Sequence, residues 1–324
     1  MTPDRPLLGI VLMLGFCLLV PLSDAMAKIL GATLALPVII LARFVVQGAI
    51  LAAVMALTGT RLVVRRDIWG WIVLRTLLFI AGMGLMFAAL RAMPLADAVA
   101  IAFVMPFILL IFSSLLGEEV GPARWSACAI GFLGTLMVIR PNFAEVGAAA
   151  LLPLGVALVF ALFMLATRRI SREIEPVPLQ AVTGVLGAAI LLPAAVLMVP
   201  AAEIVAPLSD PRLLGMLAVM GLFGTLAHLC MTGALKFAPA ATLAPMQYLE
   251  IPFATLTGWI VFRDLPDGLA AAGICVTVGA GLYIIWREER LSRERKSTGA
   301  AARPAPGPAP RSAPAPTAPP RSRR

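Results

Sequence analysis

Residues 240–262 read AATLAPMQYLEIPFATLTGWIVF, and the organisation of the whole chain can be worked out from them. The stretch is long enough to cross a bilayer, because a membrane-spanning helix needs about 20 predominantly apolar residues. Gln247, Tyr248 and Glu250 lie near its middle, and Pro252 follows them. A carboxylate at that depth needs a polar cavity or a partner. We interpret the stretch as one wall of a substrate pathway; the alternative is that Glu250 pairs with an arginine only to hold helices together.

The composition also indicates a membrane protein with many spans. Of the 324 residues, 60% are hydrophobic and 13% are charged, whereas soluble proteins have about 25% charged residues. The net charge of +9 does not indicate nucleic-acid binding, because the basic residues lie in short loops and in the C-terminal tail. The expected partners are therefore a small-molecule substrate and membrane lipids, and no nucleic acid.

The chain carries no recognisable signature of an enzyme or a metal site. Its four cysteines are isolated within apolar runs, so neither metal binding nor a disulfide is expected. GxSxG, HExxH and GxxxxGK[ST] motifs do not occur. We expect no catalytic residue and no cofactor. A membrane-embedded lipid-modifying enzyme is a distant alternative, since the only polar cluster at one membrane face is Glu118, Glu119 and Arg124, which is typical of a solvated loop.

Ten apolar runs predict an all-α polytopic membrane protein with ten transmembrane helices. They cover residues 7–30, 35–58, 68–90, 95–117, 123–140, 148–170, 177–200, 212–234, 240–262 and 268–286. The first run is similar to a cleaved signal peptide, but we interpret it as a span because the first repeat, described below, needs it.

Lys and Arg orient these spans, because cytoplasmic loops are enriched in them. With the N-terminus inside, the inner connections include residues 61–66 and 168–172, each with three arginines, and the basic segment after Trp286. We therefore expect a multi-pass protein of the bacterial inner membrane with both termini in the cytoplasm. Residues 291–324 are basic and rich in Pro and Ala, which predicts a disordered cytoplasmic tail.

The sequence also repeats itself at a long interval. Ala89-Leu90-Arg91 with Pro94 matches Ala234-Leu235-Lys236 with Pro239, an offset of 145 residues. We assign residues 1–145 to a first repeat and 146–290 to a second, each with five spans. Because five is odd, the second repeat is inverted relative to the first. Inverted repeats are typical of secondary transporters, which bind substrate near the bilayer midplane.

Ionisable residues within the spans are the candidate site. Asp24 and Lys28 share one helix face and can pair. Arg43 and Arg75 each need an anionic partner, a water-filled cavity or an anionic substrate group. Asp97 and Glu250 are the available carboxylates, and the pairing is left open. The remaining candidates are His228, as a proton relay or a packing residue, Tyr248, as a stacking surface for a heterocycle, and Gln247 beside it.

Each of the two halves of the chain contains a fourth-span proline, an acidic loop and a glycine-containing fifth span. In these features the chain resembles the EamA-type members of the drug/metabolite transporter superfamily. Several stretches are similar to the S-adenosylmethionine uptake branch, and bacterial riboflavin importers are similar too. The stretches are Ser23-Asp24 to Lys28, Ala42-Arg43-Phe44, Leu74-Arg75 to Gly82-Met83, Ala244-Pro245 to Tyr248-Leu249-Glu250, and Leu265-Pro266-Asp267. Ser23 and Gln247 depart from the S-adenosylmethionine branch. The resemblance implies a central cavity lined mainly by spans 1, 3, 4, 6, 8 and 9.

The expected function is secondary transport of a small organic metabolite across the inner membrane by alternating access. The resemblance implies a substrate like S-adenosylmethionine or riboflavin, with a coupled proton or an exchanged metabolite. Glu250 would meet a cationic substrate group or the proton, and Arg75 would meet a carboxylate or balance Glu250. Export of amino acids or toxic metabolites is the alternative.

Overall fold

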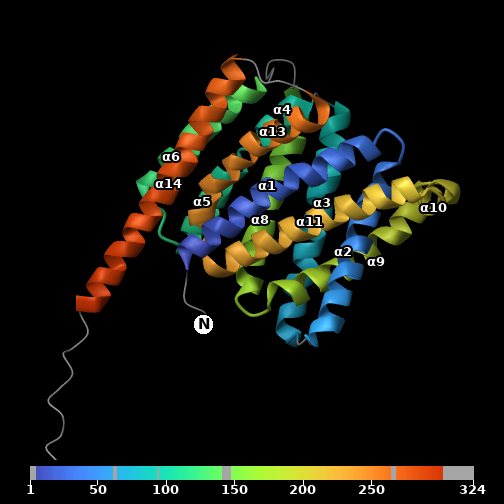
Figure 1. The fold of residues 1–324 in the computed structure, drawn as a ribbon, viewed down its shortest axis with the longest axis horizontal. Helices are drawn as coiled ribbons and strands as arrows, with labels where there is room; N and C mark the ends of the chain where they lie inside the picture. The colour runs from blue at the N-terminus through green and yellow to red at the C-terminus, as the bar shows by residue number, and fades with distance from the viewer. Residues whose placement is uncertain (1–4, 61–63, 93–94, 141–146, 264–267, 302–324) are drawn as a thin grey trace, which may run out of the picture.

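The computed structural model describes residues 5–60, 64–92, 95–140, 147–263 and 268–301, which form helices joined by short connections (Figure 1). The first part of the chain contains α1 (Pro6–Leu30), α2 (Leu36–Thr58), α3 (Arg66–Ala92), α4 (Leu95–Ala102), α5 (Met105–Leu115) and α6 (Pro122–Ile139). The second part contains the 3₁₀ helix η1 (Gly147–Ala150), α8 (Leu151–Ser171), α9 (Pro176–Met198), α10 (Ala201–Ser209), α11 (Pro211–Phe237), α12 (Ala240–Leu243), the 3₁₀ helix η2 (Ala244–Leu249), α13 (Glu250–Phe262) and α14 (Gly268–Ala301).

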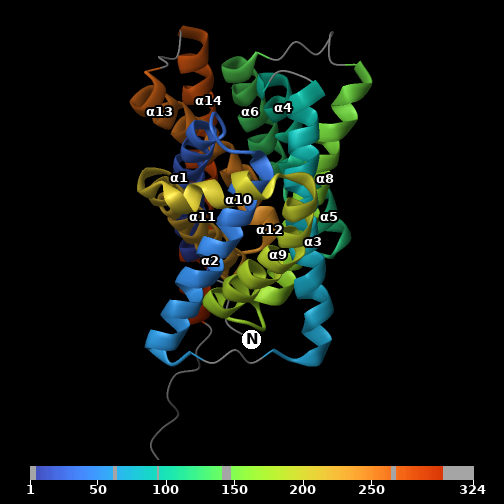
Figure 2. The ribbon, with the colours of Figure 1, turned by 90° about the vertical axis from the view of Figure 1, so that its right-hand side faces the viewer.

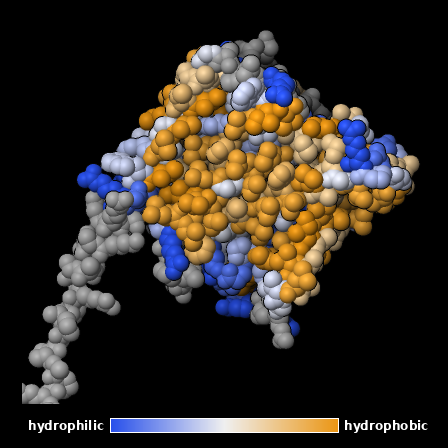
Figure 3. Space-filling model, viewed as in Figure 1, coloured by the Kyte–Doolittle hydropathy of each residue, from blue (hydrophilic) through white to orange (hydrophobic). Residues whose placement is uncertain are grey.

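Eight helices within the described residues are long and apolar enough to cross a membrane, namely α1, α2, α3, α6, α8, α9, α11 and α14. They coincide with eight of the predicted spans. Large apolar side chains such as Leu57, Val185 and Leu197 are exposed on their outer faces, and Figure 3 shows apolar residues covering most of the central surface in that view. An exposed apolar surface of this extent needs a lipid environment. The protein is a multi-pass membrane protein.

The predicted fourth and ninth spans are not continuous helices. In residues 95–117, α4 ends at Ala102 and α5 begins at Met105, with Pro106 in its first turn. Residues 240–262 are divided into α12, η2 and α13, and Pro252 lies in the first turn of α13. A proline fits the first turn of a helix but not its interior, where it removes a backbone hydrogen bond. The sequence predicts that Pro106 and Pro252 lie inside continuous spans. In the structure, each of these prolines lies in the first turn of a new helix.

Each long helix packs against a helix from the other half of the chain. The pairs are α1 with α11, α2 with α9, α3 with α8, and α6 with α14 (Figures 1 and 2). Glycines allow close approach in two pairs, as is common between membrane helices. A Cβ atom added at Gly184 of α9 would lie 2.6 Å from the backbone nitrogen of Gly48 of α2, and one at Gly273 of α14 would lie 2.6 Å from the carbonyl oxygen of Gly134 of α6.

The structure departs from the predicted spans at two other places. A short helix, α10, lies between α9 and α11, where the sequence predicted only a connection. Helix α14 continues to Ala301, past the predicted end of the last span at residue 286 and into the segment assigned to the tail. Residues 302–324 lie outside the described part of the chain, as does Leu265-Pro266-Asp267.

The glycine contact between α2 and α9 predicts a specific sensitivity. Gly184→Ala places a methyl group against the backbone of Gly48, and the resulting overpacking should lower the free energy of unfolding by about 1–3 kcal/mol. Thermal unfolding of the purified protein in detergent measures the change. Gly258→Ala in α13, where an added Cβ has no neighbour within 4 Å, is the control and should leave the melting temperature unchanged or slightly higher. Equal melting temperatures for the two variants would contradict the prediction.

Candidate functional site

Charged and polar side chains from five helices face one another in the interior. Asp24 comes from α1, Arg43 from α2, Arg75 from α3, His228 from α11 and Glu250 from the start of α13. Asp24 interacts electrostatically with both Arg43 and Glu250, and His228 interacts with both arginines. The structure thus brings together five of the residues that the sequence singled out one span at a time.

Arg75 is completely buried, and its hydrogen bonds go to hydroxyl groups. Its Nε donates to Thr167 Oγ1 at 2.8 Å and its Nη1 to Thr183 Oγ1 at 2.7 Å. Its guanidinium carbon lies 4.7 Å from the ring centre of Phe163, a distance typical of a cation–π contact. No carboxylate forms an ion pair with Arg75 in the described residues, so the partners of its guanidinium there are neutral. Arg75 links α3 to α8 and α9.

Arg43 is only half-buried, and its surroundings differ from those of Arg75. Its guanidinium carbon lies 5.8 Å from the ring centre of Phe79. Gly224 of α11 leaves room on the other side: an added Cβ would lie 2.9 Å from Arg43 Nε. That Nε is buried, and it has no hydrogen-bond partner among the described residues. Arg43 is therefore a positioned cation whose hydrogen-bonding capacity is unused.

The two carboxylates of the cluster are accessible to different degrees. Asp24 is exposed and Glu250 is half-buried, and neither makes an ion pair within the described residues. Asp24 interacts electrostatically with Arg43. Lys28 lies exposed in the last turn of α1. The side chain of Asp97 lies outside the described residues, so its predicted role stays open.

His228 is buried among aromatic rings. Its ring centre lies 4.8 Å from that of Phe79, 5.8 Å from that of Phe16 and 6.2 Å from that of Phe163, each in an edge-to-face arrangement. Its backbone carbonyl accepts a hydrogen bond from Gln180 Nε2 at 2.9 Å. These contacts form an aromatic wall beside the two arginines, and they show how His228 packs.

The unwound segment η2 buries Gln247 and Tyr248. Tyr248 donates a hydrogen bond from its hydroxyl to the carbonyl oxygen of Phe103 at 3.1 Å, which lies between α4 and α5. Its ring packs against Gly131, where an added Cβ would come within 2.7 Å. Tyr248 therefore connects η2 to the segment between α4 and α5, and its predicted role as a stacking surface stays a prediction. The side-chain nitrogen of Gln247 is buried and has no hydrogen-bond partner in the described part of the chain.

Sequence reasoning missed the hydrogen-bonding residues that support this cluster. Gln180 of α9 binds Gln47 of α2, with 3.0 Å between the two side chains, and Thr232 of α11 at 2.7 Å. Together with Thr167 and Thr183 they connect four helices around the arginines. The only signal in the sequence is that these residues are polar within apolar runs, which does not say what they contact.

At one end of the bundle, Glu118 joins several helix ends. Glu118 Oε2 accepts a hydrogen bond from the backbone nitrogen of Ala241 at 3.1 Å, and Glu118 Oε1 lies 3.9 Å from Arg168 Nε. Arg168 Nη1 donates to the carbonyl oxygen of Leu235 at 2.6 Å. Arg124 pairs with Glu288 at 2.9 Å, and both side chains are largely buried. The expected solvated loop is thus a set of partly buried contacts between helices.

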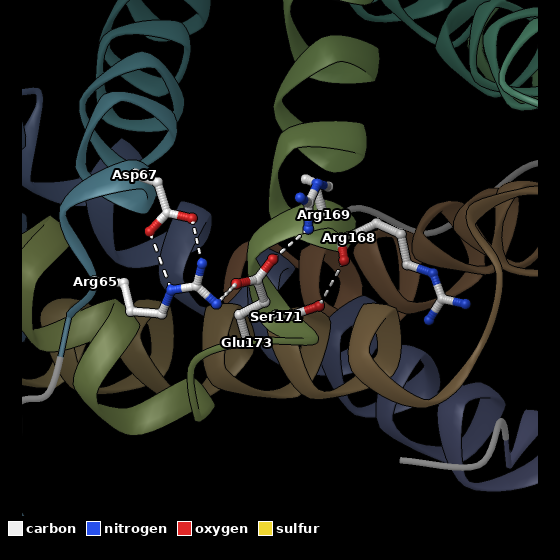
Figure 4. Close-up of polar contacts among 6 residues, drawn as sticks. All are labelled: Arg65, Asp67, Arg168, Arg169, Ser171 and Glu173. Atoms are coloured by element: carbon white, nitrogen blue, oxygen red, sulfur yellow. Dashed lines mark hydrogen bonds and ion pairs between the residues drawn. The ribbon is translucent and has the colours of Figure 1, made fainter. Parts of the chain in front are cut away.

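A neighbouring group of ion pairs is more exposed (Figure 4). Arg65 pairs with Asp67 at 2.8 Å and with Glu173 at 3.8 Å, and Glu173 also pairs with Arg169. Ser171 donates a hydrogen bond to the carbonyl oxygen of Arg168 at 3.2 Å. Exposed ion pairs contribute about 0–1 kcal/mol each. This group aligns the start of α3 with the end of α8 and is separate from the interior cluster.

Within the described residues, no three His, Cys, Asp or Glu side chains gather as metal ligands. The chemistry that the interior cluster offers is binding: accessible carboxylates, one positioned guanidinium and aromatic faces. None of these groups is arranged as a nucleophile with an adjacent base in the part of the chain that the structure describes.

The hydroxyl contacts of Arg75 predict a stability effect. The double variant Thr167→Val, Thr183→Val leaves a buried cation without two hydrogen bonds, each worth about 1.5–3 kcal/mol when the donor is charged. Thermal unfolding should show a large decrease in stability. Thr76→Val is the matched control, because Thr76 is equally buried and its hydroxyl bonds only to the carbonyl of Ile72 in its own helix. A double variant as stable as the control would show that Arg75 is satisfied by other groups.

Comparison with known proteins agrees with this architecture. The EamA-like transporter family matches the chain twice, over residues 7–140 and 147–287. A riboflavin transporter of Rhizobium johnstonii is 34% identical over 68% of this chain and 71% of its own length. An S-adenosylmethionine uptake transporter of Rickettsia prowazekii is 24% identical over 67% of this chain and 72% of its own length. A crystal structure 21% identical to this chain shares its fold, with a TM-score of 0.70 over 85% of this chain and 94% of that one.

The family and these relatives are transporters rather than enzymes, and the resemblance noted from the sequence is confirmed. The protein belongs to the EamA-like transporter family.

Proposed function

We propose that this protein is a secondary transporter that carries a small heterocyclic metabolite across the bacterial inner membrane by alternating access. The observation that supports this most is the interior cluster: two carboxylates that interact with each other, and a guanidinium whose buried Nε has no hydrogen-bond partner in the described residues, next to the ring of Phe79. Ionisable groups at membrane depth mark substrate or ion pathways. Asp24, Arg43 and Glu250 would contact the substrate or a coupled proton.

Ten spans in two inverted halves are part of the proposal. The family matches once in each half, and α1 pairs with α11 just as α3 pairs with α8. In the proposed repeat, α1 is equivalent to α8 and α3 is equivalent to α11. If each helix is replaced by its equivalent from the other half, the pair of α1 with α11 becomes the pair of α8 with α3. The pairs of α2 with α9 and of α6 with α14 stay the same. The interruptions also correspond, because each precedes a Pro-Phe pair, at residues 106–107 and 252–253. Interrupted helices that meet between inverted repeats are typical of transporter substrate sites.

The substrate class follows from the wall around His228 and from the relatives. Phe79, Phe163 and Phe16 offer apolar faces and edges on which a flat heterocycle can pack. Riboflavin and S-adenosylmethionine both carry such a ring system together with polar groups, and both are named among the relatives. A flavin-type compound is the first candidate because the riboflavin transporter is more similar to this chain.

Import is proposed because one relative is named as an uptake transporter, and the two ends of the bundle indicate which state of the transport cycle the structure represents. Asp24 lies toward the end of α1 that the basic loops assign to the outside, and it is exposed. At the opposite end, Glu118 and Arg168 connect the ends of α5, α8, α11 and α12. That arrangement corresponds to a site open to the outside and closed toward the cytoplasm, with both termini on the closed side.

Substitution of Glu250 tests the proposed role of the cluster. Glu250→Gln keeps the shape of the side chain but removes its charge, so uptake of labelled riboflavin into proteoliposomes should fall about tenfold or more, which corresponds to about 1.4 kcal/mol of lost binding. Glu173→Gln changes an exposed carboxylate of the Figure 4 group and should transport normally.

Protein amount and melting temperature must be equal in the two variants for the comparison to count. Full uptake by Glu250→Gln would make Glu250 a packing residue. Uptake only into vesicles of the opposite orientation would favour the exporter reading.

A further inference from the structure

We propose that Arg43 and Asp24 together recognise a polar edge on the substrate that presents a hydrogen-bond acceptor next to a donor, and that Gly224 sets the position of the Arg43 guanidinium for this task. The inference rests on the proposed transport function and adds to it the class of group that is bound and the residues that bind it.

The two interior arginines differ in how many of their hydrogen-bond donors are already bound to other residues. Arg75 is fully buried, bonded to Thr167 and Thr183, and covered by the ring of Phe163. Arg43 lies one helix away, is half-buried, and makes no hydrogen bond or ion pair with the described residues. A buried polar group without a partner needs an explanation in a native structure, such as a ligand. Arg43, and not Arg75, is therefore the cation available to a substrate.

Two contacts hold the Arg43 side chain without using its donors. The ring of Phe79 lies 5.8 Å from its guanidinium carbon. On the other side, the missing side chain of Gly224 lets the guanidinium approach α11: an added Cβ would lie 2.9 Å from Nε and 3.2 Å from Cζ and Nη2. A guanidinium held in this way presents a planar fork of donors, which matches paired acceptor oxygens.

Asp24 supplies the complementary acceptor. It interacts electrostatically with Arg43 but does not close onto it in an ion pair, and it is exposed. Arg43 therefore offers donors, held in place by Phe79 and Gly224, and Asp24 is the carboxylate that acts on it electrostatically. This arrangement complements the imide edge of a flavin, in which an N–H lies between two carbonyl groups, and also the carboxylate and ammonium of an amino-acid head group. The two ligands share this chemistry, and binding measurements distinguish them.

Binding to the purified full-length protein in lipid nanodiscs, measured by calorimetry, tests the inference with two matched pairs of probes. Riboflavin is compared with 3-methylriboflavin, in which a methyl group replaces the imide hydrogen. S-adenosylmethionine is compared with its decarboxylated form, which lacks the acceptor oxygens. The protein should bind the parent compound of one pair about tenfold or more tightly than its altered partner, because an unpaired polar group in the site opposes binding.

Five variants show which residues carry the discrimination. Arg43→Gln and Arg43→Lys lack the fork, so they should bring the affinities for S-adenosylmethionine and its decarboxylated form to within about twofold of each other. Asp24→Asn lacks the carboxylate that would accept from the imide N–H, so it should do the same for riboflavin and 3-methylriboflavin. Gly224→Ala keeps the charge but displaces the guanidinium; it should weaken S-adenosylmethionine about threefold or more and leave its decarboxylated form nearly unchanged, and it should weaken both flavins, which keep their carbonyl groups. Gly215→Ala is the control on the same helix, because an added Cβ there meets nothing within 4 Å. It should behave as the unchanged protein does.

The outcomes separate this inference from the proposed function. S-adenosylmethionine binding with full discrimination retained in the Arg43 variants, or riboflavin binding as tight in the Arg43 variants as in the unchanged protein, would overturn the role of Arg43 and leave the transport proposal intact. Failure of all four probes to bind the unchanged protein would overturn the substrate class and this inference with it. If Arg43→Gln does not fold, Arg43→Lys and Gly224→Ala carry the same comparison.

Discussion

Every polar group inside the bilayer must find its partner within the protein, and this constraint governs the whole structure. It is most demanding where a span is interrupted, because backbone groups lose their helical partners there. The hydroxyl of Tyr248 binds the free carbonyl of Phe103, and the carboxylate of Glu118 binds the backbone nitrogen of Ala241. The first contact satisfies backbone between α4 and α5, and the second satisfies the first turn of α12. In both cases the partner comes from the other half of the chain.

The same constraint separates two arginines that look alike in the sequence. Arg75 is saturated by two threonines and an aromatic face, so it joins helices. Arg43 is held by Phe79 and by the space at Gly224, with donors left over. Removing a charge from water is tolerable only with compensation. The charge of Arg43 is incompletely compensated within the described residues. This is expected of a side chain that binds a ligand.

The fold positions this cluster through close helix pairs. Glycine contacts bring α2 against α9 and α6 against α14, and the Gln47–Gln180–Thr232 hydrogen bonds tie α2, α9 and α11 together beside the arginines. Asp24 is exposed on its side of the cluster, and contacts of Glu118 and Arg168 connect the ends of α8, α11 and α12. A rigid frame with one closed end suits a binding site that must be reached from one side at a time.

The sequence by itself determined the membrane location, the apolar spans, the family and the set of ionisable residues at membrane depth, because apolar length and charge are properties of local sequence. It did not determine that the helices predicted over residues 95–117 and 240–262 are interrupted: Pro106 and Pro252 are compatible with a kinked helix as well as with a new helix start. Nor could it assign Thr167 and Thr183 to Arg75, since residues 92 and 108 positions apart meet only through packing. Which charges are satisfied and which stay available is decided by these long-range contacts, and therefore by the tertiary structure alone.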